Sequence, residues 1–544
     1  MEKPNPPIDP NSGFCSETKT FYSLRPPLHL PPETTPLSVA SYAFSLQLTS
    51  RWPDSTALID SATGQRVSYT EFAQRTRILA GTLQSVVGLC KGDTAFILSP
   101  NSMKIPILYF SLLSLGVVVS PANPASTESE ISRQIELCKP VIAFATSAVA
   151  YKVPNTLRCQ TVLIDSPEFD SMMTSPVRGV NSVEVSQSDL AAIMYSSGTT
   201  GKVKGVMLTH RNLIAIVATY HQHRVKRESP AVVLYTVPYF HIFGFFCCAK
   251  AVAVSESVVV MEKFDLGRMM RTVEEFKVTL LAVAPPIVVA MTKSDAAEGY
   301  DLRSLEAVGC GAAPLGKDTI AAFKARFAGV VLYQGYGMTE STGAVTRSMG
   351  AEESLRWGSA GKLIGSYEAK IVDPGSGIAL PPCKHGELWV RGPTIMKGYV
   401  GDPKATSEAL VSDGWMRTGD LCYFDEEGFL FVVDRLKELI KYKAYQVPPA
   451  ELEQLLQSHP DILDAAVIPY PDEEAGQVPM AFVVRRLQSN LNEAQVMDFV
   501  AKQVAPYKKI RRVAFVNSIP KSAAGKILRK ELREIAHLGS ASRL

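Results

Sequence analysis

Between residues 195 and 212 the chain places small and hydroxylated residues at a density that no hydrophobic core requires. The glycines Gly198, Gly201 and Gly205 can adopt positive φ and approach a ligand closely, and Lys204 adds a positive charge. The hydroxyl donors of the stretch are Ser196, Ser197, Thr199 and Thr200. Backbone amides, hydroxyls and a cation together suit a polyphosphate, so we expect this loop to hold the phosphates of a nucleotide.

The spacing of this loop differs from the Walker P-loop, which needs glycine, four residues and then Gly-Lys-Ser/Thr. The apolar run at residues 189–194 is typical of a buried strand, and the residues after Thr209 are typical of a helix. We therefore predict that the loop joins a strand to a helix, a usual place for anion binding in α/β proteins. A surface loop rich in serine and glycine is the alternative interpretation.

Two further segments, at residues 309–315 and 334–340, are rich in small residues. Small residues let a planar adenine lie against the backbone, and Tyr336 offers an aromatic face on which it can stack. Two ordinary tight turns are the alternative interpretation of these segments. Farther along, Asp420 follows a Thr-Gly turn, where a carboxylate can accept both hydroxyls of a ribose.

Histidine and lysine residues supply the remaining candidates. His241 lies in an aromatic run at residues 237–246, where a lone histidine is more often a satisfied core residue than a ligand. Charged residues crowd together at 434–446, and Lys526 follows a glycine in the lysine-rich segment 519–530. A lysine-rich terminus is usually only solvated, so these residues alone do not identify a reaction.

Alternating strand and helix patterns supply the scaffold for these motifs. The chain has 544 residues, of which 46% are hydrophobic, enough for two or more domains. A capping box from Ser68 to Glu71 begins a helix that should reach residue 83. Further helices are predicted at residues 104–116 and 128–138, and strands at 94–98, 117–119, 141–145 and 161–164. This alternation predicts an α/β fold with parallel sheets covered on both faces.

The composition narrows the class of protein. The net charge of +3, without a basic run among aromatics, does not favour nucleic-acid binding. Nine cysteines without a Cys-x-x-Cys pair favour a reducing compartment and argue against structural zinc. The proline-rich residues 1–36 are expected to form an extended arm rather than a core element, and they do not resemble a secretory signal. The longest apolar stretch, residues 107–119, is shorter than the roughly 20 residues of a membrane helix.

In their order along the chain, these motifs resemble the signatures of the adenylate-forming (ANL) superfamily, which includes acyl-CoA synthetases, luciferases and peptide-synthetase adenylation domains. The resemblance covers residues 37–530 and is closest to plant 4-coumarate:CoA ligases and their peroxisomal relatives. It implies an α/β fold with a large multi-layer N-terminal domain and a small, mobile α+β C-terminal lid. The expected segments are an arm at 1–36, the AMP-binding domain at 37–434, the lid at 435–541 and a targeting tripeptide at 542–544.

The resemblance also assigns roles to residues. Thr339 is expected to touch the α-phosphate, Glu340 to bind Mg²⁺, and Lys526 and Lys441 to serve the first and second half-reactions, with His241 at the acyl group. The implied ATP- and AMP-binding residues are Ser196, Ser197, Gly198, Thr199, Thr200, Lys204, Gln334, Gly335, Tyr336, Thr339, Asp420, Arg435, Lys437, Lys441, Gln446 and Lys526. The implied acyl pocket consists of His241, Phe243, Cys247, Gly311, Ala312 and Gly335. The implied coenzyme A site consists of Lys263, Lys443 and Ala444, where the family usually has glycine at the last position.

The implied reaction converts a carboxylate and ATP into an acyl-adenylate, which coenzyme A then captures as a thioester. The expected acid is a cinnamate-type acid, or a jasmonate precursor or fatty acid that feeds peroxisomal β-oxidation. Transfer of the acyl group to another acceptor and luciferase-type oxidation stay open as alternatives, and a non-catalytic nucleotide-binding homologue is a further one. The required cofactors would be ATP, Mg²⁺ and coenzyme A.

The final residues, Ser542–Leu544, resemble the Ser-Lys-Leu peroxisomal address, with arginine preserving the positive charge. We therefore expect a peroxisomal enzyme that an import receptor recognises, with the cytoplasm as the alternative location. The other expected partner is the small-molecule acid. No nucleic acid and no membrane span are expected, and the chain should be a monomer.

Overall fold

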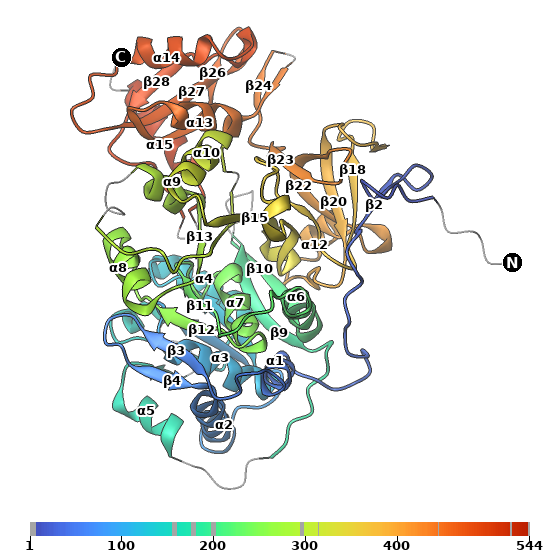
Figure 1. Cartoon of the computed structure of the whole chain (residues 1–544), viewed down its shortest axis with the longest axis vertical. Coiled ribbons are helices and arrows are strands. Elements are labelled where there is room, and N and C mark those ends of the chain that lie inside the picture. The colour runs from blue at the N-terminus through green and yellow to red at the C-terminus, as the bar shows by residue number, and fades with distance from the viewer. Residues whose placement is uncertain are drawn as a thin grey trace, which may run out of the picture.

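A computed structural model describes residues 7–154, 160–175, 181–196, 203–293, 299–313, 315–443, 445–522 and 525–541. A large body carries most of the chain, and a smaller C-terminal unit, drawn in red, lies at one end beside α9 and α10 (Figure 1). The mixed α/β architecture confirms the fold class that the sequence predicts. Among the described helices, none combines the length and the apolar character that a membrane crossing needs.

The first sheet has the strand order β21-β10-β9-β6-β5-β7-β8. Strands β9, β6, β5, β7 and β8 run parallel, as the alternating sequence pattern predicts, whereas β10 is antiparallel to both β9 and β21. The strands are β5 (Thr94–Leu98), β6 (Val118–Ala122), β7 (Ile142–Ala145), β8 (Gln160–Leu163), β9 (Leu190–Ser196), β10 (Lys204–Thr209) and β21 (Gly398–Tyr399). Helices that follow these strands are α3 (Lys104–Ser114), α4 (Glu128–Cys138), α5 (Pro167–Thr174), α6 (His210–Gln222) and α12 (Pro403–Ala409).

The second sheet has the order β17-β16-β15-β14-β13-β11-β12-β3-β4, with a parallel centre and antiparallel strands at both ends. Its strands are β3 (Thr56–Asp60), β4 (Arg66–Ser68), β11 (Val232–Tyr235), β12 (Ser257–Val260), β13 (Leu280–Val283), β14 (Ala307–Cys310), β15 (Val331–Met338), β16 (Gly343–Arg347) and β17 (Lys362–Leu363). Its helices are α7 (Ile242–Ala253), α8 (Leu266–Phe276), α9 (Pro285–Lys293), α10 (Lys317–Arg326), α11 (Gly350–Glu353) and the 3₁₀ turn η3 (Thr339–Ser341). Helices α1 (Val39–Leu48), α2 (Tyr69–Ser85), α3, α6 and α7 share one large hydrophobic core with strands of both sheets.

A third, antiparallel sheet has the order β1-β2-β18-β20-β22-β23, with β19 beside β18. Its strands are β1 (Phe14–Cys15), β2 (Thr20–Tyr22), β18 (Glu368–Val372), β19 (Ala379–Leu380), β20 (Gly386–Arg391), β22 (Met416–Phe424) and β23 (Leu430–Arg435). The first two strands correct our prediction for the N-terminal arm. Phe21 is fully buried and stacks on Phe424, because pairing of β2 with β18 satisfies the backbone of the arm while its aromatic side chains complete the core.

The C-terminal unit is a small α+β structure with its own hydrophobic clusters. Its sheet has the order β25-β24-β27-β26, and β28 pairs parallel with β27. The elements are β24 (Ile440–Tyr442), β25 (Tyr445–Val447), α13 (Pro449–Ser458), β26 (Ile462–Asp472), β27 (Gly476–Arg485), α14 (Glu493–Ala501), β28 (Arg512–Phe515) and α15 (Arg529–Ala541). This unit matches the small second body that the resemblance implies.

The surroundings of the presumed phosphate loop differ from our prediction. The loop does not lead directly into a helix, because the short run Lys204–Thr209 forms β10, and helix α6 begins only at His210. Strand β10 is held by β9 on one side and by β21, almost two hundred residues away, on the other. The loop therefore connects two antiparallel strands, and residues 197–202 within it lie outside the described part of the chain.

Candidate active site

A cavity of about 1920 Å³ lies where the first and second sheets, strand β23 and the C-terminal unit meet. Residues from distant parts of the sequence line it. The fold thus brings together motifs that are far apart along the chain. The expected site residues on its wall are Ser196, Lys204, His241, Phe243, Cys247, Gly311, Ala312, Gln334, Gly335, Tyr336, Thr339, Glu340, Arg435, Lys437 and Lys526.

Asp420 lies in a buried polar network and lines a smaller cavity of about 470 Å³, which shares Tyr336, Arg435 and Lys526 with the first. Its Oδ2 atom accepts a hydrogen bond from the Tyr336 hydroxyl at 2.6 Å, and its Oδ1 atom pairs with Arg435 Nε at 3.1 Å. Strands β22 and β23 fix the pair because Asp420 and Arg435 are opposite each other in the register. Burial raises the pKa of Asp420, and the Arg435 cation opposes this rise. A carboxylate with two occupied and two free lone pairs can still accept two hydroxyl groups.

Thr339 and Glu340 lie in the short 3₁₀ turn η3, and both are buried. The Tyr399 hydroxyl donates to Glu340 Oε1 at 3.0 Å, and the Lys204 ammonium lies 4.6 Å from the centre of the Tyr399 ring. Burial, with the Glu340 charge in second place, raises the pKa of Tyr399. Strand β21, which carries Tyr399, thus links the lysine after the loop to the carboxylate of η3.

Lys526, which belongs to the C-terminal unit, lines the same cavity. A tight turn holds its backbone, since the Ser522 N–H donates to its carbonyl at 2.8 Å and its own N–H donates to Ser522 Oγ at 3.2 Å. Burial lowers the pKa of Lys526, and the neighbouring Arg435 cation lowers it further. Lys437 also faces the cavity, and burial lowers its pKa to about 8. An anion that entered this region would be attracted by several cations at once.

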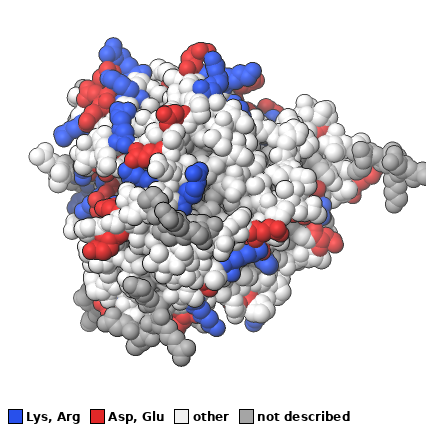
Figure 2. Space-filling model, turned by 90° about the horizontal axis from the view of Figure 1, so that it is seen from below, with Lys and Arg blue, Asp and Glu red and all other residues white. Residues whose placement is uncertain are grey.

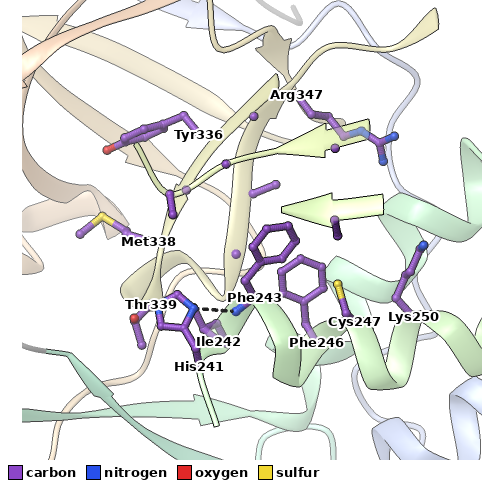
Figure 3. A pocket seen from close by; sticks show the side chains of 18 of the residues that line it. His241, Ile242, Phe243, Phe246, Cys247, Lys250, Tyr336, Met338, Thr339 and Arg347 are labelled. Atoms are coloured by element: carbon purple, nitrogen blue, oxygen red, sulfur yellow. Dashed lines mark hydrogen bonds between the residues drawn. The ribbon is translucent and has the colours of Figure 1, made fainter. Parts of the chain in front are cut away.

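The opposite side of the cavity is apolar and is built on helix α7 (Figure 3). His241 is the N-cap of this helix, and its Nδ1 atom accepts the Phe243 N–H at 3.3 Å. Burial lowers the pKa of His241 to about 4, so the ring is neutral near pH 7 and its hydrogen is on Nε2. Phe243 stacks with Phe246 at a centroid distance of 5.7 Å, and burial raises the pKa of the adjacent Cys247 thiol to about 12.

Sequence reasoning missed a group of charged and aromatic residues farther along this side. Lys250 forms a buried ion pair with Glu256, whose Oε2 atom accepts the Tyr235 hydroxyl at 2.5 Å. The rings of Tyr220 and Phe246 stack, and Arg347 lies over the Tyr220 ring at 4.4 Å. A lysine in the otherwise apolar helix 242–253 was the one sequence signal for this group.

Several expected site residues lie elsewhere. Lys263, Lys441, Lys443 and Gln446 are exposed and do not line the cavity. The Lys441 N–H donates to Gln477 Oε1 at 2.8 Å, and the Lys443 ammonium pairs with Glu474 at 2.7 Å. The remaining expected residues, Ser197, Gly198, Thr199, Thr200 and Ala444, lie outside the described part of the chain.

Two observations concern the kinds of ligand that this protein could bind. Among the described residues, no cluster of three or more His, Cys, Asp or Glu side chains could hold a metal ion by itself. Glu340 nevertheless fits Mg²⁺, which proteins commonly bind through one or two carboxylates together with substrate phosphates. On the face drawn in Figure 2, blue and red side chains are interspersed, so this face presents no continuous basic surface for nucleic acid.

The fold matches that of adenylate-forming enzymes. ATP-bound MatB from Rhodopseudomonas palustris superimposes with a TM-score of 0.81 at 27% identity, covering 92% of this chain and 99% of that one. o-Succinylbenzoate CoA synthetase (MenE) from Bacillus subtilis, in complex with the acyl-adenylate OSB-AMP, gives a TM-score of 0.78 at 27% identity, covering 90% and 97%.

The family models described as AMP-binding enzyme and AMP-binding enzyme C-terminal domain match residues 47–400 and 451–526. The chain belongs to the AMP-binding enzyme family of the ANL superfamily, which confirms the resemblance, and it is an enzyme of the acid–thiol ligase class. 4-Coumarate–CoA ligase-like 9 of Arabidopsis thaliana is 54% identical over 99% of this chain and 98% of the relative. Peroxisomal OPC-8:0-CoA ligase 1 of the same plant is 47% identical over 97% and 98%.

Proposed function

We propose that this enzyme joins a carboxylic acid to coenzyme A in two steps, through an acyl-adenylate. The observation that carries the proposal is one continuous cavity with a cationic side and an apolar side. The carboxylate of the acid attacks the α-phosphate of ATP, pyrophosphate leaves, and the thiol of coenzyme A then displaces AMP. The mixed anhydride is needed because a carboxylate is a poor electrophile and AMP is a good leaving group.

The residues on the cationic side serve the first step. Asp420 holds the ribose hydroxyls, Tyr336 stacks on the adenine, and the Lys526 cation stabilises negative charge on the α-phosphate as the carboxylate attacks. Mg²⁺, held by Glu340, would neutralise part of the phosphate charge. His241 can donate its Nε2 hydrogen to a carboxylate oxygen and so orient the acid, because Nδ1 is occupied by the Phe243 N–H.

The second step needs a thiol where Lys526 now lies. Lys441, Lys443 and Gln446 are on the exposed β24–β25 hairpin, which follows directly after the segment that carries Arg435 and Lys437. Rotation of the C-terminal unit about Lys437 would withdraw Lys526 and present this hairpin to the acyl-adenylate. Ala444 would then lie beside the pantetheine path, with Lys443 and Lys263 near coenzyme A.

Separate assays of the two half-reactions test this division. Lys526→Ala should lose acyl-adenylate formation, measured by pyrophosphate exchange, whereas Lys441→Ala should keep it and fail to form the thioester. Equal loss of both half-reactions in each folded variant would refute the two orientations. Release of AMP that does not depend on coenzyme A would instead favour transfer to another acceptor, and light emission or oxygen uptake would favour luciferase-type oxidation.

The acid is proposed to be cinnamate or a larger apolar acid, such as a jasmonate precursor or fatty acid. Phe243 and Cys247 offer no hydroxyl on the part of the wall that they form, and a ring hydroxyl buried without a partner costs about 1–3 kcal/mol. The relative named an OPC-8:0-CoA ligase also supports an acid other than a cinnamate. A preference for caffeate over cinnamate in kcat/KM would be the opposite of what this pocket should produce.

Peroxisomal residence is part of the proposal, supported by the tripeptide Ser542–Leu544 and by the peroxisomal relative. The tripeptide lies outside the described residues. A fluorescent protein fused at the N-terminus should give peroxisomal puncta through the import receptor, and deletion of the tripeptide should return it to the cytoplasm. Diffuse fluorescence from the intact fusion would overturn this location. The enzyme should also elute as a monomer in size-exclusion chromatography.

A further inference from the structure

Arg347 occupies the end of strand β16 and lines the cavity. Its guanidinium lies 4.4 Å from the centre of the Tyr220 ring, and the Lys250 ammonium lies 5.6 Å from the same centre. In Figure 3 both cations lie on the side of the Phe243 and Phe246 rings that is away from His241. Arg347 is therefore at the far end of the acyl side, beyond the two phenylalanines.

Apart from its contact with the Tyr220 ring, the guanidinium of Arg347 has no hydrogen bond or ion pair among the described residues, and its Nη1 atom is buried without an acceptor. Two carboxylates of this region are engaged by other groups. Glu353 accepts Arg25 Nη2 at 2.8 Å, and Arg25 also donates to the Arg347 carbonyl at 3.0 Å. Glu256 is paired with Lys250 and with the Tyr235 hydroxyl. Among the described residues, the positive charge of Arg347 is thus not paired with a carboxylate.

The strand register indicates how far this charge is from the reacting carboxyl group. Arg347 is opposite Gly335 in the β15–β16 pair, and β15 continues to Met338, directly before Thr339. Four residues of strand, at about 3.4 Å each, place the backbone of Gly335, beside Arg347, roughly 14 Å from that of Thr339. An acid that spans this distance brings its far end to the Arg347 guanidinium.

We infer that Arg347 determines specificity by donating hydrogen bonds to an oxygen acceptor, a carbonyl or a carboxylate, at the far end of the acid. This inference rests on the proposed ligase function and narrows its substrate class. A purely apolar acid expels water from the part of the guanidinium that faces the cavity and offers it no acceptor, whereas an oxygen at that end of the acid can accept its hydrogen bonds. The pocket thus suits an acid that is apolar along its middle and oxygenated at its distal end.

The test compares three unbranched acids of equal length, one ending in a methyl group, one in a methyl ketone and one in a second carboxylate. Pyrophosphate release gives kcat/KM for each acid, and the ratio of oxygenated to methyl acid is the readout. Arg347→Met removes the charge at similar volume, and Arg347→Lys retains it. The matched control is Lys362→Met on β17, opposite Arg347 in the register, whose ammonium lies 4.6 Å from the Phe429 ring centre and outside the cavity lining.

The wild-type enzyme should prefer an oxygenated acid roughly 10- to 100-fold, as expected for a hydrogen bond to a charged group. Arg347→Met should remove this preference for an oxygenated acid, and Arg347→Lys should retain part of it. Lys362→Met should leave the preference unchanged. The ketone and dicarboxylate arms identify which acceptor fits. A wild-type ratio near one, or an unchanged ratio in Arg347→Met, overturns the inference while the ligase function stands. Absence of pyrophosphate release with all acids overturns the proposed function itself.

Discussion

Asparagine in place of Asp420 should weaken AMP binding about 10- to 150-fold, the equivalent of about 1.5–3 kcal/mol for one hydrogen bond to a charged group. In the structure, Tyr336 and Arg435 each occupy one lone pair of the carboxylate, which leaves one on each oxygen for the two ribose hydroxyls. Asparagine keeps one acceptor oxygen, so one of the two ribose contacts is lost. Titration calorimetry with AMP measures the change directly.

Asp425→Asn is the matched control for this experiment. Asp425 is also a buried carboxylate paired with an arginine, since it accepts Arg356 Nη2 at 2.7 Å, but unlike Asp420 it lines neither the large cavity nor the smaller one beside it. Both substitutions should lower thermal stability, and only Asp420→Asn should weaken AMP binding. An Asp420→Asn enzyme that binds AMP within twofold of the wild type, or an equal loss in Asp425→Asn, would refute the assignment of the ribose to Asp420.

Three further predictions concern residues on the two sides of the cavity. Because burial lowers the pKa of Lys526, this lysine loses its positive charge at a lower pH than an ordinary lysine, so kcat/KM for ATP should begin to fall below pH 10.5. Lys526→Arg should move this decrease in kcat/KM to higher pH. The same pH profile in both enzymes would exclude this role for Lys526. Phe243→Tyr with Cys247→Ser should raise the caffeate-to-cinnamate ratio of kcat/KM roughly 2- to 10-fold, and a falling ratio would contradict the proposed pocket. Lys250→Met should lower the free energy of unfolding by about 3–5 kcal/mol, because Glu256 is left buried without its ion pair. A denaturation curve that matches the wild type would show that the ion pair does not contribute to stability.

Local sequence signals predicted the regular elements well. The helix at residues 128–138 has the predicted bounds because Thr127 and Glu130 form a reciprocal capping box, a signal within four residues. Strand β5 likewise matches residues 94–98, since its apolar run is short and bounded. Many residues of the motifs line the cavity, whereas the exposed Lys263, Lys441, Lys443 and Gln446 do not, and the roles of all these residues stay predictions.

The features that were missed depend on contacts between distant residues. Strand β10 was assigned to a loop because its stability comes from β9 and from β21, whose residues 398–399 are far along the chain. The arm at 1–36 joins a sheet only because β18 lies beside it, 346 residues after β2 by the register of Tyr22 with Glu368. The sequence does not distinguish Arg347 from other charged residues. Only the structure shows that it lies over Tyr220 in the cavity and that its guanidinium has no ion pair among the described residues.

The central claim, activation through an acyl-adenylate, is tested most directly by the fate of the carboxylate oxygen. The enzyme is incubated with an acid labelled with ¹⁸O in both carboxylate oxygens, together with ATP, Mg²⁺ and coenzyme A, and the products are analysed by mass spectrometry. The account predicts one labelled oxygen in the phosphate of AMP for each thioester formed, and none in pyrophosphate. Label in orthophosphate with formation of ADP, or a thioester formed without labelled AMP, would contradict it.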